Sequence, residues 1–408
     1  MTMADKSSVA DVCTLITRGI SPAYDETGIT VLSQKCVREN RVILEAARMT
    51  NPQMKKVPAD KLLRLNDVLV NSTGVGTLGR VAQVKQIAGN VTVDSHVSIV
   101  RPDPEKIDPR FFGYAMVLNQ PQIEAMGVGA TGQTELSRTR LGQEIFIPRP
   151  PLPVQRRVAD ILSAFDDLME NSQRRIRLLE AMARAFYREW FVHFRFPGHE
   201  KHPRVASALG DIPRGWEVKR VPDCVDISPR VAVPRDGEKP FVPMGCLSND
   251  SMLITDIESR SGNSGAKFQN GDTLFARITP CLENGKTGFV QFLLEPQAVG
   301  FGSTEFIVLR SRTLTPEFVY LLARSDEFRG VAIKSMSGAT GRQRVQEQCF
   351  DDFQIVQPPP ALLDRFSAIV AQSFRLIYKL HLQIENLRLT RDLLLPRLLS
   401  GQLEIGNN

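Results

Sequence analysis

A helical stripe of apolar residues occurs twice in this chain, at an offset of about 208 positions. Apolar side chains recur at steps of four and three residues, which places them along one side of an α-helix. Nine of ten stripe positions are apolar in the first copy: Val158, Leu162, Phe165, Met169, Ser172, Ile176, Leu179, Ala183, Phe186 and Trp190. Eight of ten are apolar in the second: Phe366, Val370, Ser373, Ile377, Leu380, Ile384, Leu387, Arg391, Leu394 and Leu398. The pattern predicts two long, similar helices.

The spacing of the stripes favours a coiled coil. The steps average about 3.5 residues, the coiled-coil period, whereas a straight surface helix repeats about every 3.6 residues. The alternative is that each helix packs only on its own globular domain. Because the termini of a domain usually lie close together, the second helix should begin near the end of the first, and the pair should run antiparallel. The stretch 158–190 would span about 50 Å at about 1.5 Å per residue.

Short β-like runs precede each stripe and follow the same order in both halves of the chain. The first half has them at 67–70, 79–84 and 97–101, and the second at 272–275, 285–290 and 306–310. A short helical segment follows in each half, with Pro109 or Pro316 at its first position, where proline is well tolerated. Each half is therefore predicted to begin with a mixed α/β domain whose sheet is antiparallel or mixed.

Proline-rich segments separate these domains from the helices, as at Pro150-Pro151 and Pro359-Pro360, and favour stiff joints. The polar, Pro/Gly-rich segment after the first helix is predicted to link the two halves. The predicted division is a first domain at 1–150, a first central helix at 151–195, a linker at 196–215, a second domain at 216–357 and a second central helix at 358–402. The fold class is α+β: two similar α/β domains, separated by two long antiparallel coiled-coil helices and related by a pseudo-two-fold axis.

Composition narrows the class of protein only modestly. The 408 residues are 42% hydrophobic and 24% charged, which is ordinary for a globular chain. No apolar run is long enough to span a membrane, and the polar N-terminus lacks a signal-peptide pattern, so a cytoplasmic location without a membrane partner is expected. Six scattered cysteines without a CxxC motif predict reduced thiols. The net charge of +6 suits a polyanionic partner but does not establish one.

Motifs for catalysis or cofactor binding are missing from the sequence. The run Gly285-Lys286-Thr287 resembles the end of a phosphate-binding loop, but Pro280 stands where the first glycine of that motif belongs. No GxGxxG fingerprint follows a strand, and no Asn/Asp-Pro-Pro-Tyr/Phe tetrapeptide of amino-methyltransferases occurs. His193, His199 and His202 would be the candidates for a metal site, but loop histidines are more often solvated. We therefore predict neither a catalytic residue nor a metal ligand in this chain.

Polar and basic loops at equivalent places in the two domains are the candidate binding surfaces. Arg, Gln, Ser and Thr on glycine-flanked loops suit hydrogen bonds to DNA phosphates and base edges. The candidate DNA-binding residues are Ser72, Thr73, Arg80, Thr131, Gln133, Arg138 and Arg140 in the first domain, and Arg277, Lys286, Thr340, Arg342, Gln343 and Arg344 in the second. Ordinary solvated loops, or turns kept for the fold, would produce the same recurrence, so this alternative stays open.

Four segments together resemble one known family. They are 150–162, with its Pro-Pro-Leu-Pro-Val-Gln start of the first helix, 189–198, 209–217 and 390–401. On these segments the chain resembles the specificity (S) subunit of type I restriction-modification systems, over essentially its whole length. Two departures occur: the first domain lacks the Ile-Pro-x-Gly-Trp opening seen at 212–216, and Leu362-Leu363-Asp364 stands where the family's glutamine is expected.

The resemblance implies a DNA-reading adaptor without catalysis of its own. Two target-recognition domains would each read one half of a split, asymmetric site on double-stranded DNA, and the antiparallel helices would set the gap. Two modification subunits would dock on the helices and methylate adenine with S-adenosylmethionine. Restriction subunits would add ATP- and Mg-dependent translocation and cleavage, so this chain itself would bind no cofactor. The alternatives are the specificity chain of a fused restriction-methylation (type II-like) enzyme, and a scaffold that does not bind DNA.

Lengthening one central helix tests whether the helices act as a spacer. Insertion of one turn, about 5.4 Å, should change the number of base pairs between the two halves of the recognised site. Mapping methylated sites with the complete system measures that gap. An unchanged gap would show that the helices do not set it.

Overall fold

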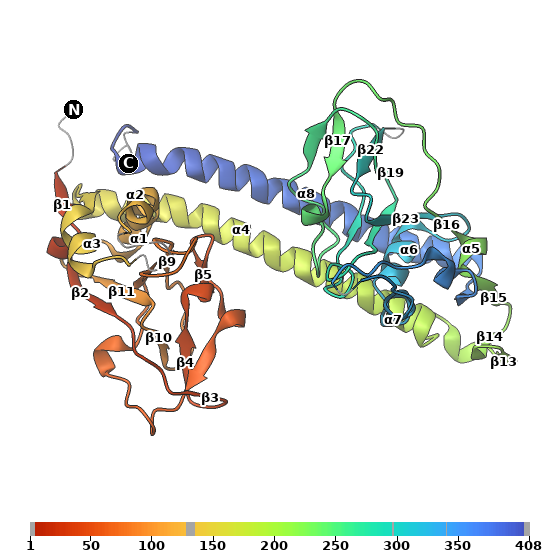
Figure 1. Cartoon of the computed structure of the whole chain (residues 1–408), viewed down its shortest axis with the longest axis horizontal. Helices are drawn as coiled ribbons and strands as arrows, with labels where there is room; N and C mark the ends of the chain where they lie inside the picture. The colour runs from red at the N-terminus through yellow and green to blue at the C-terminus, as the bar shows by residue number, and fades with distance from the viewer. Residues whose placement is uncertain (1–4, 128–134, 296–297, 340, 404–408) are drawn as a thin grey trace. The chain divides into compact units, whose positions relative to one another are not determined.

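The computed structural model of this chain describes residues 5–127, 135–295, 298–339 and 341–403. The chain forms two compact units: Met1–Leu168 with Asn386–Asn408, and Met169–Glu385. Each unit contains one α/β domain and part of each of two long helices, α4 (Leu152–Tyr187) and α8 (Pro360–Leu399) (Figure 1). In the described part of the chain, no helix has the length and apolar character that crossing a bilayer requires.

The first domain is built on two four-stranded sheets. One is fully antiparallel, in the order β2 (Cys13–Arg18), β11 (Val97–Pro102), β8 (Val68–Asn71) and β9 (Val81–Gln83). The other has the order β10 (Val91–Val93), β4 (Ile29–Leu32), β7 (Arg48–Thr50) and β3 (Tyr24–Asp25), and its β10–β4 pair is parallel. The domain closes where β1 (Lys6–Ser8) pairs with β12 (Phe146–Pro148), so its first and last strands are neighbours.

The second domain repeats the antiparallel sheet and the closing strand pair, and it also has a four-stranded mixed sheet, in which the parallel pair lies in the middle and not at the edge. Its antiparallel sheet has the order β16 (Val225–Ile227), β23 (Phe306–Ser311), β20 (Thr273–Ala276) and β21 (Thr287–Phe289). Its mixed sheet has the order β18 (Glu258–Arg260), β17 (Lys239–Val242), β22 (Val299–Gly302) and β19 (Ala266–Gln269), with β17–β22 parallel. The closing pair is β15 (Glu217–Arg220) with β24 (Gln354–Gln357). The prediction of two similar α/β domains is confirmed.

Helices that begin with proline follow the central strand in both domains, as predicted. They are α1 (Pro109–Leu118) and α6 (Pro316–Ala323). The side chain of Asp108 accepts hydrogen bonds from two backbone N–H groups of α1, and Thr315 accepts one from Phe318 of α6. These caps satisfy donors that the first helical turn leaves free, which fixes where each helix starts.

The segment expected to be a linker (196–215) carries regular structure. A β-hairpin forms between β13 (Arg204–Ser207) and β14 (Gly210–Pro213), and a short 3-10 turn covers His199–Lys201. Before it, α4 continues as a π-helical turn at Arg188–Val192. The Pro/Gly content of this segment therefore belongs to tight turns and not to an extended connection.

A buried ion pair ties the central strands together in both domains. Arg101 donates two hydrogen bonds to Asp67, at 2.8 Å each, and Arg310 donates two to Asp272, at 2.7 and 2.6 Å. Both carboxylates are only 1% exposed. Each carboxylate also accepts the backbone N–H three residues before it, which shapes the turn that enters the strand. The aspartate begins the first predicted β-run of each half and the arginine ends the third, but the sequence does not show that the two side chains pair.

The apolar stripes are the buried sides of α4 and α8. All twenty stripe positions are buried or half-buried, including Ser172 and Arg391. In the first unit, Val158 and Leu162 share a core with Leu395 and Leu398, so the start of α4 meets the end of α8. In the second unit, the ring of Trp190 lies 6.0 Å from that of Phe366, so the end of the first helical segment meets the start of α8. The helices are antiparallel in each unit, as predicted.

Both interpretations of the stripes hold at once, because the helices pack on each other and on the domains. In the first unit, the core that holds the two helices also contains Phe111 and Phe112 of α1. In the second unit, Phe318 of α6 lies 4.8 Å from Phe191, which itself contacts Phe366. Burial of aromatic and aliphatic side chains at about 25 cal/mol per Å² makes these junctions a main source of stability.

The Pro-Pro-Leu-Pro-Val-Gln start of α4 has a structural reason. Gln155 is 1% exposed; its carbonyl oxygen accepts the backbone N–H of Asp108 at 2.8 Å, and its amide donates to the carbonyl of Pro150 at 2.7 Å. The glutamine thus fastens α4 to the start of α1. At the corresponding position in α8, 208 residues later, Leu363 is 3% exposed. An apolar contact replaces the hydrogen bonds there.

Breaking the buried ion pair should destabilise the second unit. Arg310→Met leaves Asp272 buried without its partner and should lower the free energy of unfolding by about 3–5 kcal/mol. Arg312→Met is the matched control, because Arg312 pairs with Asp226 at the surface with its side chain 52% exposed, and it should cost at most about 1 kcal/mol. Urea unfolding followed by tryptophan fluorescence measures both, since Trp190 and Trp216 lie in this unit. Equal losses would contradict the role of the buried pair.

Candidate nucleic-acid interface

The predicted binding loops occupy equivalent places in the two domains. The backbone N–H of Leu136 donates to the carbonyl of Ser72 at 2.8 Å, and that of Val345 donates to the carbonyl of Arg277 at 2.8 Å. Each bond joins the residue that follows a central strand, β8 or β20, to the loop that precedes the last strand of the domain, β12 or β24. Ser72 and Arg277 are therefore structural equivalents.

The two equivalent side chains differ in exposure and chemistry. Ser72 is fully buried, and its hydroxyl lies 2.6 Å from that of Ser98. It holds the end of β8 against β11 and presents no group to solvent. Arg277 is half-buried; it pairs with Glu347 at 2.8 Å and donates to the carbonyl of Val345 at 2.9 Å. Its Nε atom is buried without a hydrogen-bond partner among the described residues.

Two further candidates of the first domain, Thr73 and Arg80, have polar partners close to them in the chain or on a neighbouring loop. The hydroxyl of Thr73 lies 2.7 Å from Nδ1 of His96. Arg80 donates to the carbonyl of Gly76 at 2.8 Å and lines a cavity of about 580 Å³ together with Arg38 and Gln120. Thr73 and Arg80 are both partly exposed, so they remain accessible to a ligand.

The second loop of the first domain is described only in part. Thr131 and Gln133 lie outside the described residues. Arg138 is exposed at the first position of α3 (Arg138–Glu144). Arg140 donates two hydrogen bonds of 2.8 Å to Glu144, and these bonds hold the pKa of that carboxyl below its usual value. Arg138 is thus the more available cation of the two.

The matching loop of the second domain shows the same contrast. Thr340 lies outside the described residues, and Arg342 is exposed without a side-chain partner in the described part of the chain. The backbone N–H of Gln343 donates to the hydroxyl of Thr279 at 3.1 Å. Arg344 pairs with Glu305 at 2.6 Å, and its hydrogen bonds lower the pKa of that carboxyl. Arg342 is therefore free to contact a phosphate, whereas Arg344 is already partly neutralised.

Lys286 is turned toward the protein itself. Its ammonium group donates to the carbonyl of Met244 at 3.0 Å, and its side chain is only partly exposed. This contact ties the strand β21 to the 3-10 turn Met244–Cys246. A structural role accounts for Lys286 without any ligand.

A basic groove in the second domain contains residues that the sequence analysis missed. The groove has a volume of about 700 Å³ and is lined by Arg230, Lys267 and Arg277, with Glu347 as its acidic residue. Within the described part of the chain, neither Arg230 nor Lys267 has a hydrogen bond or ion pair through its side chain. Arg230 follows β16 and Lys267 lies in β19, so only the fold brings these cations together.

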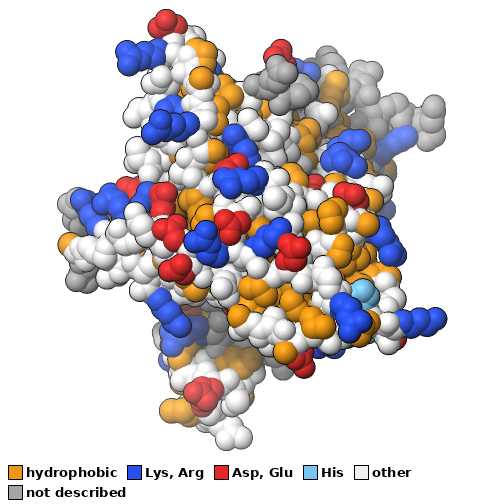
Figure 2. Space-filling view, turned by 90° about the vertical axis from the view of Figure 1, so that its right-hand side faces the viewer, with side chains coloured by type: hydrophobic (Ala, Val, Ile, Leu, Met, Phe, Trp, Pro, Cys, Tyr) orange, Lys and Arg blue, Asp and Glu red, His pale blue; other side chains and the backbone are white. Residues whose placement is uncertain are grey.

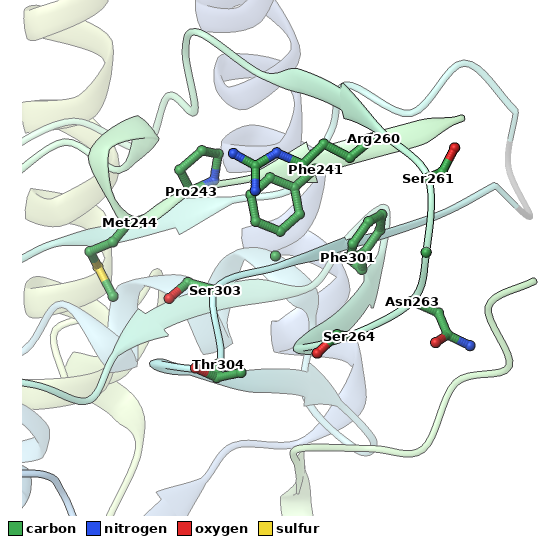
Figure 3. Close-up of a pocket in the computed structure, with 12 residues that line it drawn as sticks. Phe241, Pro243, Met244, Arg260, Ser261, Asn263, Ser264, Phe301, Ser303 and Thr304 are labelled. Carbon is green, nitrogen blue, oxygen red and sulfur yellow. The ribbon is translucent and has the colours of Figure 1, made fainter. Parts of the chain in front are cut away.

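An aromatic pocket adjoins the basic groove (Figure 3). It has a volume of about 560 Å³, and Thr304 lines both spaces. The rings of Phe241 and Phe301 lie 5.0 Å apart, and the guanidinium of Arg260 stacks 4.0 Å above Phe241. An open pocket with stacked aromatic, cationic and hydroxyl groups offers both apolar and hydrogen-bonding contacts to a nucleotide.

Charge on the surface is mixed. Figure 2 shows one face on which Lys and Arg side chains alternate with Asp and Glu and with apolar groups. Because so many basic side chains have acidic neighbours, net charge is a poor guide to the binding surface. A better guide among the candidate and groove residues is the absence of any side-chain hydrogen bond or ion pair in the described part of the chain, which holds for Arg138, Arg230, Lys267 and Arg342.

Comparison with known proteins shows which proteins this chain is similar to. Residues 6–181 match the model of the type I restriction modification DNA specificity domain. The chain is 25% identical over 276 residues to the specificity subunit of the type I restriction enzyme MjaIX from Methanocaldococcus jannaschii, covering 64% of this chain and 62% of that subunit. It is 31% identical over 156 residues to the EcoEI specificity subunit from Escherichia coli, covering 36% of this chain and 26% of that subunit. Residues 6–181 thus match a type I restriction modification DNA specificity domain, and the chain is similar to specificity subunits of type I restriction enzymes.

The fold is similar to that of a solved S subunit. A crystal structure of the S subunit of a type I restriction-modification system from M. genitalium superposes with a TM-score of 0.59 at 13% identity, covering 99% of this chain and 98% of that one. The alignments to the two curated subunits above span less than two thirds of their lengths. The structural comparison shows the fold, and the sequence comparisons show a type I DNA specificity domain over residues 6–181.

Loss of an unpaired cation should weaken DNA binding through its electrostatic component. Arg230→Ala, Lys267→Ala or Arg342→Ala should each reduce the slope of log K against log salt by about 1, if each contacts one phosphate. Arg344→Ala should change the slope less, because Glu305 already neutralises that guanidinium. Titrations of the assembled complex with DNA at several salt concentrations measure these slopes. If all three variants keep the wild-type slope of log K against log salt, neither the basic groove nor the loop that carries Arg342 contacts DNA.

Proposed function

We propose that this chain is the non-catalytic specificity subunit of a type I restriction-modification complex and reads a split, asymmetric site on double-stranded DNA. Each domain would read one part of the site. One observation carries this proposal: the two domains share a framework but have different side chains at equivalent loop positions. Ser72 in the first domain corresponds to Arg277 in the second, and Glu135, which precedes Leu136, corresponds to Arg344.

These differences matter because base recognition depends on the donors and acceptors at each position. Arginine donates in a planar fork that matches guanine or phosphate, whereas serine and glutamate cannot do so. Two domains that share an antiparallel sheet but differ in loop chemistry would recognise two different short sequences. A repeated scaffold with a single loop chemistry would instead favour a symmetric site.

The outer sides of the helices support a second part of the proposal, the docking of two modification subunits. In the first unit, Leu168, Leu389 and Leu393 are 50%, 60% and 57% exposed. In the second unit, Leu178, Met182 and Leu382 are 54%, 51% and 49% exposed. Exposed aliphatic residues in such numbers on long helices are typical of a surface that a partner covers.

The division of labour in the complex follows from this proposal. The modification subunits would bind S-adenosylmethionine and methylate adenine, and restriction subunits would use ATP and Mg for translocation and cleavage. The chain itself would contribute sequence recognition and assembly, and it would bind no cofactor. No group of acidic, cysteine and histidine side chains in the described part of the chain is arranged to hold a metal ion.

Reconstitution tests the proposal directly. The chain is mixed with its modification subunits, S-adenosylmethionine and a DNA library, and the methylated adenines are located by sequencing. We expect methylation at a split sequence, only when this chain is present. Methyl transfer by this chain alone, or methylation by the complex without any split sequence, would contradict the proposal.

A further inference from the structure

Arg391 is the one charged residue in the apolar stripes, and it lies in the buried side of α8 with its side chain 22% exposed. Its guanidinium pairs with Asp166 of α4 at 2.6 Å and with Asp392 at 2.7 Å. All three residues lie in the first unit, where Leu394 and Leu395 continue the apolar side of α8. A charge in a helix–helix interface therefore has a specific partner on the opposite helix.

Asp166 connects this pair to the first domain. Its side chain is 11% exposed, and its second oxygen accepts a hydrogen bond from the Tyr114 hydroxyl at 2.7 Å and pairs with the Lys85 ammonium. Burial alone would raise the pKa of Asp166, but these three partners lower it below its ordinary value. One carboxylate thus joins α4, α8, α1 and the segment after β9.

The same place in the second unit is apolar. The repeat of about 208 residues relates Asp166 to Phe374 and Arg391 to Ala183. Phe374 and Ala183 are each 2% exposed. The ring of Phe374 lies 5.1 Å from that of Phe289 in β21 and 5.5 Å from that of Tyr320 in α6, the elements that correspond to β9 and α1. The ionic cluster of the first unit is therefore replaced by an aromatic cluster.

We propose that Asp166 and Arg391 are positioning residues that permit only the α4–α8 pairing, in one register. Two α4 helices of different copies of the chain would place Asp166 against the apolar position of Ala183, and two α8 helices would place Arg391 against that of Phe374. A slip of about one turn would bring Arg391 toward Leu162 or Met169 of α4. Each alternative buries a charge without its partner, which disfavours it strongly.

This inference deepens the proposed function and rests on it in one respect. Both domains are attached to the same two helices, so the register of the helices decides how far apart the two parts of the DNA site can be. A buried polar pair that fixes the register of a helix pair would then also keep the gap in the DNA site constant. The discrimination against pairing of two copies does not depend on DNA at all.

A variant that removes the polar cluster while filling its space tests the inference. Tyr114→Phe, Asp166→Leu and Arg391→Leu are combined, because together they leave no buried carboxylate, guanidinium or phenol without a partner. Replacement of a buried ion pair by packed apolar groups is often neutral for stability, so this variant should keep its thermal unfolding midpoint. Arg391→Lys retains the cation and serves as the conservative variant. Arg110→Leu with Asp160→Leu is the matched control, because that pair also links α1 to α4 but is exposed.

Two readouts decide the outcome. Light scattering of the isolated full-length chain should show dimerisation strengthened on the order of 100-fold in the triple variant, relative to wild type and to both control variants. Methylated sites of the reconstituted complex should show more than one gap with the triple variant and one gap with the others. Either change supports the inference, and a triple variant that matches the wild type in both overturns it. If the wild-type complex methylates no split site, the proposed function fails, and light scattering alone decides this inference.

Discussion

The structure depends on the apolar contact between α4 and α8. In each unit the α/β domain also packs on this contact, through Phe111 and Phe112 in the first unit and Phe318 in the second. The helices therefore do not form an independent coiled coil to which domains are appended. Their buried side is shared by three elements at once, and this explains why the stripes are long, regular and almost free of charge. A substitution in the buried side of α4 or α8 would also disturb an α/β domain, because the helix pair and the domain share the same buried side chains.

A buried aspartate–arginine pair belongs to the strand framework that both domains share, whereas the loop side chains differ between the domains. Asp67 with Arg101 and Asp272 with Arg310 hold the central strands in the same way. Around this constant frame, the loops carry different groups, such as Ser72 and Arg277 at equivalent positions. A frame that is stabilised from inside allows the exposed loops to change without loss of the fold. This arrangement suits the proposed function, in which the loops contact DNA and the frame holds them in place.

The two long helices, three strands of each half and the proline-started helices could be predicted from the sequence, because their signals are local periodicities and caps, whereas the order of strands in the sheets could not. The roles of single polar residues could not. Ser72 looks like an exposed loop serine, but its partner Ser98 comes from another strand, and Lys286 looks like a free cation but donates to Met244. Arg230 and Lys267 were missed because only sheet formation brings them to one groove. Arg391 interrupts the apolar stripe, and the sequence does not show that Asp166 lies opposite it on the other helix.

The central claim is that each domain reads its own part of a split DNA site. The most direct test maps methylated adenines in cells that carry the complete system, with the wild-type chain and with a chain in which Arg344, which stands where the first domain has Glu135, is replaced by alanine. The account predicts that the wild-type motif has two specific parts at a fixed gap. In the variant, the part read by the second domain should relax, while the other part and the gap stay unchanged. Relaxation of both parts together, or a single contiguous motif in the wild type, would contradict it.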